Sequence, residues 1–492
     1  MIGRIAPRRA LTICQLALVC VLAVVPVARA DTAKLAGLGY LGCVSGAAGF
    51  DGCTATALGM RQPSALAVSA DGRNIYIASR ESQTVDGFAV GADGTLSTVG
   101  CVALKGNGAN CAATSDVLTR PIQLVVSPDG AFVYAISDTD PGAFDNAGTI
   151  AILRRDAATG ALGSAGCVKS PASQRPCGTV ASKALSVTSS IAISPDGANI
   201  YVSSAATQTI VSFARNSSSG GLREIGCVQD PESIAGCNVK ARGTSGVSAM
   251  TFSPDGHQLY AAAAAVDTIT AFARDSGSGQ LSNGPCYIDS VVADKAPCTS
   301  VPQLQHPAAL AVSPDGRNLY VGSIRSGSLS TFARDPGGAL TFKSCVQPPT
   351  QMLCGNSEGL ANPVALAISP DGTKLVLAMP DISAVSAFTR DPSSGAVTFS
   401  GCVTEIYRTG CGASAAGLLD VTGLAFSPQG DSIYVSDLGD NALTEFSSRV
   451  PVTPPPSPPS PMKKASGRRH KSNKHGARTR RCRRAKKHRR SA

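Results

Sequence analysis

Residues 308–346 read AALAVSPDGRNLYVGSIRSGSLSTFARDPGGALTFKSCV, and this stretch contains one complete structural unit. Residues 308–312 and 318–322 predict two strands, joined by the turn Ser313-Pro314-Asp315-Gly316, in which proline and glycine suit their positions. The alternating residues 328–332 predict a third strand. A second turn, 334–338, precedes a fourth strand that starts at residue 339 and ends at Cys345. The unit therefore consists of four antiparallel strands with short turns.

This unit recurs seven times along the chain. Its first turn reads SADG from Ser69, SPDG from residues 127, 194, 253, 313 and 369, and SPQG from Ser427. A pair of cysteines also recurs about every sixty residues: Cys43 with Cys53, Cys101 with Cys111, Cys167 with Cys177, Cys227 with Cys237, Cys286 with Cys298, Cys345 with Cys354, and Cys402 with Cys411. Seven repeats of four strands predict an all-β, seven-bladed β-propeller. An open β-solenoid is the alternative architecture.

The two ends of the repeat predict how the ring closes. The last unit has three strands, at 423–426, 432–435 and 443–446, and lacks a fourth. The first unit is preceded by an extra strand, Leu38 to Val44, whose Gly-Cys-Val ending matches the fourth strands of other units. We therefore expect the N-terminal strand to complete the seventh blade, which leaves no free sheet edge.

The order of small-residue strand, SPDG turn and Tyr-Val strand, as in residues 308–321, resembles a known family. These units are similar to those of the seven-bladed propeller lactonases (6-phosphogluconolactonase-like) and of the YVTN-type surface repeats. The resemblance covers about residues 38–447. It implies the propeller fold and, as one possible activity, hydrolysis of a sugar-acid lactone. The cysteine loop in every blade departs from the usual family pattern.

The N-terminus predicts export. Arg4, Arg8 and Arg9 precede an apolar run, and Ala28-Arg29-Ala30 fits a signal-peptide cleavage site, so residues 1–30 are interpreted as a signal peptide. A retained membrane anchor is the alternative. Export favours disulfides within the seven cysteine pairs over zinc sites, whose ligand spacing is absent. Closing each loop would stabilise the fold by roughly 2–3 kcal/mol. Cys482 is expected to stay unpaired.

Composition and charge divide the remaining chain into three parts. These are a propeller at 31–448, a proline-rich linker at 449–462 and a basic tail at 463–492. From Lys463 to Arg490 there are fifteen Lys/Arg and no acid, whereas residues 31–462 carry a net charge of −8. The tail composition predicts disorder and attraction to an anionic envelope polymer or lipid. A solubilising extension is the alternative. We expect no specific nucleic-acid binding, and a secreted, envelope-associated monomer.

Candidate site residues follow from the strand order. Loops between second and third strands share one rim with the cysteine loops, near the mouth of the central channel where propellers bind ligands. The charged residues of these loops are Arg80, Glu81, Asp138, Asp140, Asp267, Arg325, Asp381, Asp437 and Asp440. His306, which precedes Pro307 at the start of a first strand, is either a general base or a strand-capping residue. Each loop charge alone can equally be a solvated side chain.

Two functions compete at this stage. The first is a non-enzymatic binding or display module that uses the disulfide-loop face, tethered at the cell surface by its basic tail. The second is a hydrolase of a small sugar-acid lactone, with His306 and rim carboxylates at its site. Within the sequence there is no Gly-x4-Gly-Lys-Ser/Thr phosphate loop and no histidine-rich metal cluster. We therefore expect neither a cofactor nor a metal.

Overall fold

The structure is a computed structural model of the 492-residue chain. It describes residues 33–46, 53, 55–57, 59–107, 109–138, 148–293, 297–351, 353–405 and 411–449. The predicted signal peptide, the linker from residue 450 onward, the tail and Cys482 lie outside these ranges. Among the described residues, no helix is long and apolar enough to span a membrane.

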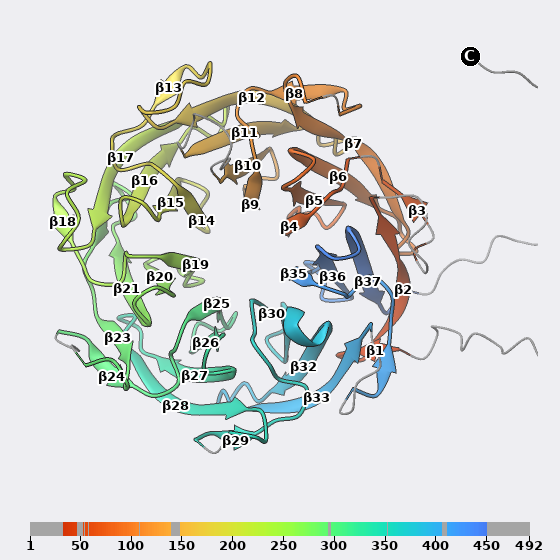
Figure 1. The fold of residues 1–492 in the computed structure, drawn as a ribbon, viewed down its shortest axis with the longest axis vertical. Coiled ribbons are helices and arrows are strands. Elements are labelled where there is room, and N and C mark those ends of the chain that lie inside the picture. Colours follow the sequence, from red (N-terminus) through yellow and green to blue (C-terminus); the bar gives the residue numbers. More distant parts are fainter. Residues whose placement is uncertain are drawn as a thin grey trace, which may run out of the picture. The chain divides into compact units, whose positions relative to one another are not determined.

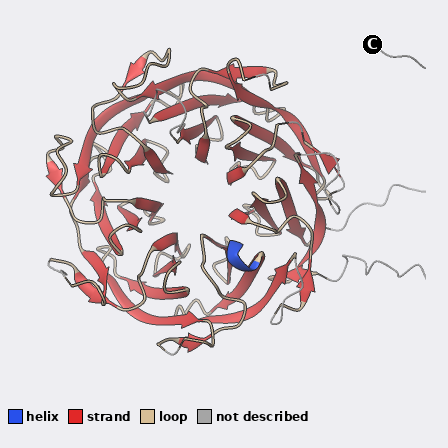
Figure 2. Cartoon of the chain, in the orientation of Figure 1, coloured by secondary structure: helices blue, strands red, loops and turns tan. Residues whose placement is uncertain are grey.

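Seven β-sheets are arranged around a central channel, as the ribbon views show (Figures 1 and 2). The strands nearest the channel are β4 (Pro63–Val68), β9 (Pro121–Val126), β14 (Thr188–Ile193), β19 (Val247–Phe252), β25 (Pro307–Val312), β30 (Ala365–Ile368) and β35 (Val421–Phe426). The blades are numbered 1 to 7 in the order of these strands. Next to them lie β5 (Asn74–Ser79), β10 (Phe132–Ser137), β15 (Asn199–Ser204), β20 (Gln258–Ala263), β26 (Asn318–Ser323), β31 (Lys374–Met379) and β36 (Ser432–Asp437).

The third strands are β6 (Thr84–Val90), β11 (Thr149–Arg155), β16 (Thr209–Arg215), β21 (Thr268–Arg274), β27 (Ser328–Arg334), β32 (Ala384–Arg390) and β37 (Ala442–Ser447). The fourth strands are β7 (Leu96–Leu104), β12 (Leu162–Lys169), β17 (Leu222–Gln229), β28 (Leu340–Gln347), β33 (Val397–Thr404), and in blade 4 the pair β22 (Leu281–Ser282) and β23 (Cys286–Asp289). The seven-bladed β-propeller is thereby confirmed.

The N-terminal strand closes the ring, as predicted. Strand β2 (Leu38–Ser45) pairs antiparallel with β37 and so becomes the fourth strand of blade 7, with Tyr40 opposite Phe446 and Val44 opposite Leu443. The short strand β1 (Lys34–Leu35) pairs with β2. The first and last described strands of the ring therefore belong to one sheet (Figure 1).

Each blade also has a fifth strand that the sequence pattern does not predict. It pairs parallel with the fourth strand, and the seven are β3 (Ala55–Thr56), β8 (Ala113–Ser115), β13 (Thr179–Val180), β18 (Val239–Lys240), β24 (Thr299–Val301), β29 (Gly355–Asn356) and β34 (Ala413–Ser414). In blade 1, Val102 pairs with Ala113, so the connection is shorter than parallel strands normally need.

A disulfide joins the two ends of this connection in every blade, which confirms all seven predicted pairs. The first cysteine of each pair lies in the fourth strand, and the second lies just before the fifth strand. The bonds are Cys43 to Cys53, Cys101 to Cys111, Cys167 to Cys177, Cys227 to Cys237, Cys286 to Cys298, Cys345 to Cys354, and Cys402 to Cys411. These fourteen cysteines are therefore structural, because each holds a fifth strand against its fourth strand.

The repeated turn between first and second strands is held by its own side chains. In blade 4 the Ser253 hydroxyl donates to Asp255 at 2.5 Å and accepts from the Gln258 amide at 3.0 Å. Gly256 has a φ of 71°, a left-handed conformation that favours glycine. These turns lie at the opposite end of the strands from the cysteine loops, as the alternation of antiparallel strands requires.

Neighbouring blades are joined by what we call the inter-blade clamp. An arginine at the end of a third strand reaches the preceding blade, where it contacts a tyrosine of the second strand and the aspartate of the repeated turn. The five clamps are Arg155 with Tyr76 and Asp71, Arg215 with Tyr134 and Asp129, Arg274 with Tyr201 and Asp196, Arg334 with Tyr260 and Asp255, and Arg390 with Tyr320 and Asp315. The tyrosines and phenylalanines that recur at equivalent positions of the second and third strands are buried.

The two seams beside blade 7 lack this clamp. Between blades 6 and 7, Val376 stands at the tyrosine position and Ser448 at the arginine position. Between blades 7 and 1, Val90 stands at the arginine position, and the buried hydroxyl of Tyr434 has no partner in the described structure. Arg449 instead contacts Asp431 at 2.9 Å and the Gly91 carbonyl at 3.2 Å. The blade closed by the N-terminal strand therefore lacks the inter-blade clamp on both of its sides.

Candidate functional site

Seven residues immediately before or near the start of the innermost strands encircle one end of the channel, and we call them the mouth ring. They are Gln62, Arg120, Val187, Gly246, His306, Asn362 and Asp420. In six blades the carbonyl of this residue accepts a hydrogen bond from the loop after the second strand, for example from Ile324 to His306 at 3.0 Å and from Leu438 to Asp420 at 2.8 Å. In blade 6 the donor position is Pro380, which has no N–H to donate. The shared bond establishes that six of these positions are equivalent, and Asn362 is assigned to the seventh by its place before Pro363.

The inner strands of the blades line the channel below the mouth ring. A cavity of about 250 Å³ lies between the inner strands, lined by small side chains such as Ser64, Ala249, Ala308 and Gly423. Hydroxyl groups here bond to the next blade: Ser64 donates to the Pro121 carbonyl at 2.9 Å. Because these groups are already paired, recognition of a ligand is left to the side chains at the mouth.

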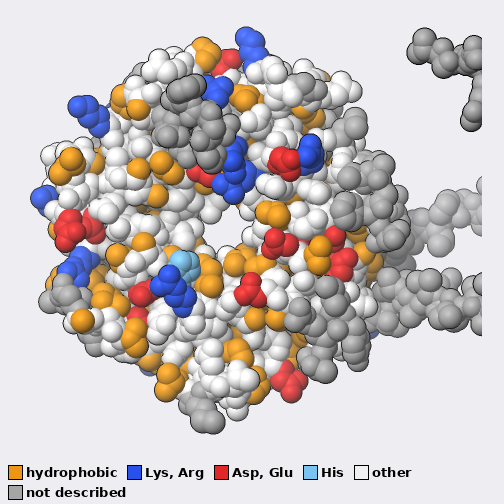
Figure 3. Space-filling view, viewed as in Figure 1, with side chains coloured by type: hydrophobic (Ala, Val, Ile, Leu, Met, Phe, Trp, Pro, Cys, Tyr) orange, Lys and Arg blue, Asp and Glu red, His pale blue; other side chains and the backbone are white. Residues whose placement is uncertain are grey.

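Polar side chains occupy five consecutive positions of the mouth ring, counted from blade 5 through blade 7 to blade 2. Blades 3 and 4 contribute only Val187 and Gly246. Figure 3 shows acidic, basic and histidine side chains gathered around the channel opening. A mouth with both charge signs on one side suits a small, hydroxylated ligand better than an apolar one.

His306 has an unusual backbone in the mouth ring. Its φ is 56°, a left-handed conformation that is costly for a residue with a side chain. Its backbone N–H donates to Asp267 of blade 4 at 2.7 Å. The buried Nδ1 of its imidazole has no hydrogen-bond partner among the described residues. The contact with Asp267 therefore accounts for the backbone of His306, and Nδ1 of its half-buried imidazole has no assigned partner in the described structure.

Two carboxylates face each other across the seam between blades 6 and 7. Burial, with a smaller contribution from the nearby charge of Asp381, raises the pKa of Asp420. Asp381 lies in the short 3-10 helix η2 (Pro380–Ile382) and accepts a hydrogen bond from the Asn362 amide. These three side chains supply acceptors that could bind sugar hydroxyl groups.

Three of the other predicted loop residues, Arg80, Asp138 and Glu81, form ion pairs. Arg80 of blade 1 pairs with Asp138 of blade 2. Glu81 pairs with Arg61, and both side chains are largely exposed. Arg325 is exposed beside His306, and no side-chain partner for it occurs in the described ranges. Asp140 lies outside the described residues.

Two further predicted residues are buried beneath the mouth instead of lining it. The carboxylate of Asp437 accepts from the backbone N–H groups of Asp420 and Asp440, each at 2.6 Å. Burial raises the pKa of Asp437 to about 7, and burial together with Asp440 raises the pKa of Glu405 to about 8. Asp437 thus positions the mouth ring from below, and Asp440 is buried with it.

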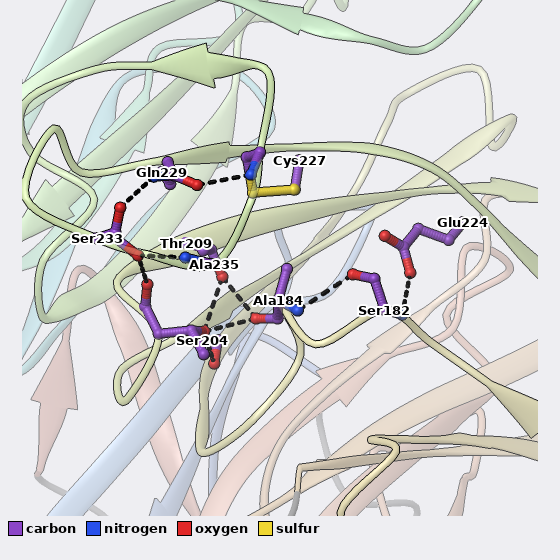
Figure 4. The surroundings of a disulfide bond; sticks show 11 residues. Ser182, Ala184, Ser204, Thr209, Glu224, Cys227, Gln229, Ser233 and Ala235 are labelled. Atoms are coloured by element: carbon purple, nitrogen blue, oxygen red, sulfur yellow. Dashed lines mark hydrogen bonds between the residues drawn. A yellow bond between two sulfur atoms is a disulfide. The ribbon is translucent and has the colours of Figure 1, made fainter.

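The disulfide loops form the outer part of the same face. In blade 3 the Gln229 side chain points into the loop, where it donates to the Ser233 carbonyl and accepts from the Cys237 amide at 2.6 Å (Figure 4). Three of these loops, in the consecutive blades 3, 4 and 5, expose an apolar side chain: Ile234 by 100%, Val291 by 67% and Leu353 by 80%. Each of these exposed apolar side chains stands on a separate disulfide loop.

Sequence reasoning found His306 but missed four other polar members of the mouth ring, namely Gln62, Arg120, Asn362 and Asp420. It considered only the loops between second and third strands. The signal was present, since three of these residues share with His306 the place directly before the proline that opens or precedes a first strand. In the described part of the chain, no group of three or more His, Cys, Asp or Glu residues could hold a metal ion.

Comparison with solved structures found proteins to which this chain is similar. The periplasmic gluconolactonase of Pseudomonas aeruginosa is 20% identical, over 69% of this chain and 85% of that chain, with a TM-score of 0.49. A protein from Lactobacillus plantarum is 19% identical, over 72% and 86%, with a TM-score of 0.50. Hydrazine synthase of Kuenenia stuttgartiensis is 15% identical, over 82% and 99%, with a TM-score of 0.52. At these identities the likeness concerns the fold alone.

A search of curated proteins found no match to this chain. The family described as "Lactonase, 7-bladed beta-propeller" matches residues 44–176, 174–283 and 288–411, which together make up more than half of the chain. These segments include six of the seven mouth-ring positions, His306 among them. On this evidence the chain belongs to the seven-bladed β-propeller lactonase family.

Proposed function

We propose that the protein hydrolyses a small sugar-acid lactone at the mouth ring. The observation that carries this proposal is the polar half of the ring, where His306, with an unpartnered buried Nδ1, lies on the blade next to Asn362 and Asp381. Membership of the lactonase family gives the reaction class. Seven disulfides favour a compartment outside the cytoplasm, where a lactone substrate would be met.

In this mechanism the imidazole of His306 takes a proton from a water molecule. The resulting hydroxide adds to the lactone carbonyl carbon, and the exposed guanidinium of Arg325 stabilises the oxyanion. The bond between that carbon and the ring oxygen then breaks, and the imidazolium returns its proton to the departing oxygen. The product is the open-chain hydroxy acid. Asn362, Asp381 and Asp420 bind the hydroxyl groups of the substrate.

The test is turnover of a panel of γ- and δ-lactones of sugar acids by the purified protein. His306→Ala should lower kcat at least ~100-fold, as expected for loss of a general base. His257→Ala is the matched control, since His257 is exposed on the turn at the opposite face. Hydrolysis no faster than the uncatalysed rate, or full activity of His306→Ala, would refute the proposal.

The exposed tips Ile234, Val291 and Leu353 favour a second function, the binding of a partner on the disulfide-loop face. The basic tail from Lys463 to Arg490 would then tether the protein to an anionic envelope polymer or lipid. A photo-cross-linking residue at position 353 should yield a specific adduct in cells that make the protein. Changing Ile234 and Val291 to Ser should abolish that adduct, and the same probe at position 371, on the opposite face, should yield none.

A further inference from the structure

We propose that Asp267 is a positioning residue for the lactone site: it holds the backbone of His306 in its left-handed conformation and thereby directs the imidazole toward the channel mouth. This inference rests on the proposed function, because it assigns the imidazole a role in catalysis. The supporting contact is the 2.7 Å hydrogen bond from the His306 N–H to Oδ1 of Asp267. The two residues belong to different blades.

The conformation at His306 requires such a support. Three mouth-ring residues have a positive φ: Gln62 at 52°, Gly246 at 67° and His306 at 56°. Glycine adopts this conformation without a penalty, whereas a Cβ atom clashes with the backbone and makes the conformation unfavourable for other residues. Only the two residues that carry side chains therefore need an external contact.

Both His306 and Gln62 have such a contact. In each case the acceptor is a residue in the preceding blade, at the end of the turn after its second strand. The residue that ends the turn after the second strand is itself left-handed in several blades, and it precedes the third strand. In blade 4 it is Asp267, which accepts from His306, and in blade 7 it is Asn441, whose Oδ1 accepts from the Gln62 N–H at 2.6 Å. In blade 3 it is Gln208, next to the glycine Gly246, and no side-chain bond from Gln208 occurs in the described structure. Among the three left-handed residues of the mouth ring, His306 and Gln62 therefore have a side-chain acceptor for their N–H, and Gly246 has none in the described structure.

The imidazole has no comparable support of its own. Its Nδ1 is buried without a partner in the described residues, so no hydrogen bond at that nitrogen fixes the ring. The backbone dihedral angles of His306 and the following Pro307 are therefore important for its direction. Loss of the Asp267 acceptor should therefore release the backbone and turn the imidazole away from the substrate.

The experiment compares Asp267→Gly, Asp267→Asn and Gln208→Gly by kinetics and crystallography. Glycine at 267 keeps the left-handed turn but removes the acceptor, while asparagine keeps the acceptor, as Asn441 does. We expect Asp267→Gly to lower kcat at least tenfold with KM changed less than twofold, and its crystal structure to show a negative φ at His306. Asp267→Asn should retain most of kcat, and Gln208→Gly, which makes the same change where no bond is lost, should match the unaltered protein.

Unchanged φ at His306 in Asp267→Gly would overturn the inference, whatever happens to kcat. A changed φ with full activity would overturn it as well, because the imidazole would then need no positioning. If the unaltered protein hydrolyses no lactone, the proposed function fails, and the catalytic part of the inference fails with it. The φ measured in the crystal of Asp267→Gly then still decides whether the carboxylate holds the backbone.

Discussion

Arg274 and Tyr201 lie on neighbouring blades, and Nε of Arg274 donates a hydrogen bond of 3.2 Å to the phenol oxygen of Tyr201. The same guanidinium contacts Asn199 at 2.6 Å and Asp196 at 2.7 Å, and only 1% of its side chain is exposed. A guanidinium offers several donors in one plane, so a single side chain joins three groups of the preceding blade. The inter-blade clamp therefore links the second strand, the repeated turn and the next blade.

Removing one clamp should destabilise the ring. Arg274→Met should lower the free energy of unfolding by about 2–4 kcal/mol, because Tyr201 and Asn199 would keep buried polar atoms without their donor. Urea unfolding measures the change. Val90→Met is the matched control at the equivalent position of blade 1, where no clamp exists, and it should cost less than ~1 kcal/mol. Equal losses in the two variants would show that the clamp contributes nothing.

Deleting residues 31–44 should open blade 7. The deletion removes β1 and most of β2, so β37 loses the partner that covers its outer edge. Hydrogen exchange measured by mass spectrometry should accelerate in β36 and β37 and stay unchanged in β15 and β16. Cys53 would lose its disulfide partner, so it is changed to Ser in both the deletion and its full-length control. If exchange in β37 is as slow as before, the N-terminal strand does not hold the blade closed.

The architecture could be read from the sequence because its determinants are local and repeated. The SPDG turns, the cysteine spacing and the missing fourth strand of the last unit predict blade number and closure. The site could be read only in part. Asp437 was predicted at the channel mouth from its loop, yet it is buried, because its carboxylate binds the amides of Asp420 and Asp440. Whether a loop carboxylate faces water or a backbone N–H depends on the neighbouring chain, which no repeat pattern specifies.

The fifth strands were missed for a similar physical reason. Each has two or three residues, such as Val239–Lys240, too few for alternation to be visible. The disulfide and the parallel pairing with the fourth strand determine its conformation, more than its own residue preferences do.

Glu445 should make stability depend on pH. It lies on β37 opposite Tyr434 of β36, and its side chain is 1% exposed. Burial raises its pKa to about 8, although Ser432 and the charge of Arg449 act in the opposite direction. The folded state therefore keeps the carboxyl protonated while the unfolded state ionises near pH 4.5. Stability contributed by this group is complete at low pH and is lost as pH rises from about 4.5 to 8.

Glu445→Gln should remove this loss. Thermal unfolding should give equal stability for variant and parent at pH 4, and a more stable variant at pH 9, with a difference that grows by at most about 1.4 kcal/mol per pH unit in between. Exposed Glu232, changed to Gln, is the control and should follow the parent at every pH. A constant difference between Glu445→Gln and the parent from pH 4 to 9 would contradict the assignment.

The basic tail should bind anionic surfaces. The comparison uses the mature chain and a chain ending at Arg449, because Arg449 contacts Asp431 and Gly91 and belongs to the propeller. The full chain should sediment with vesicles containing phosphatidylglycerol at low salt and be released at about 0.5 M salt, since exposed charges are screened over a few ångströms there. Neither chain should sediment with phosphatidylcholine alone. Equal binding of both chains, or binding that salt does not release, would exclude an electrostatic tether.

The closure of blade 7 also determines the order in which this molecule can be completed. Synthesis proceeds from the N-terminus, so β2 is made first and its partner β37 last. The disulfides do not share this delay, because each joins cysteines nine to twelve residues apart. Each disulfide can thus form as soon as its own blade has been made. This includes the bond between Cys43 and Cys53, although β2 has not yet paired with β37 at that stage. Pairing of β2 with β37 is therefore a single late step, which closes a ring whose disulfides can already be formed.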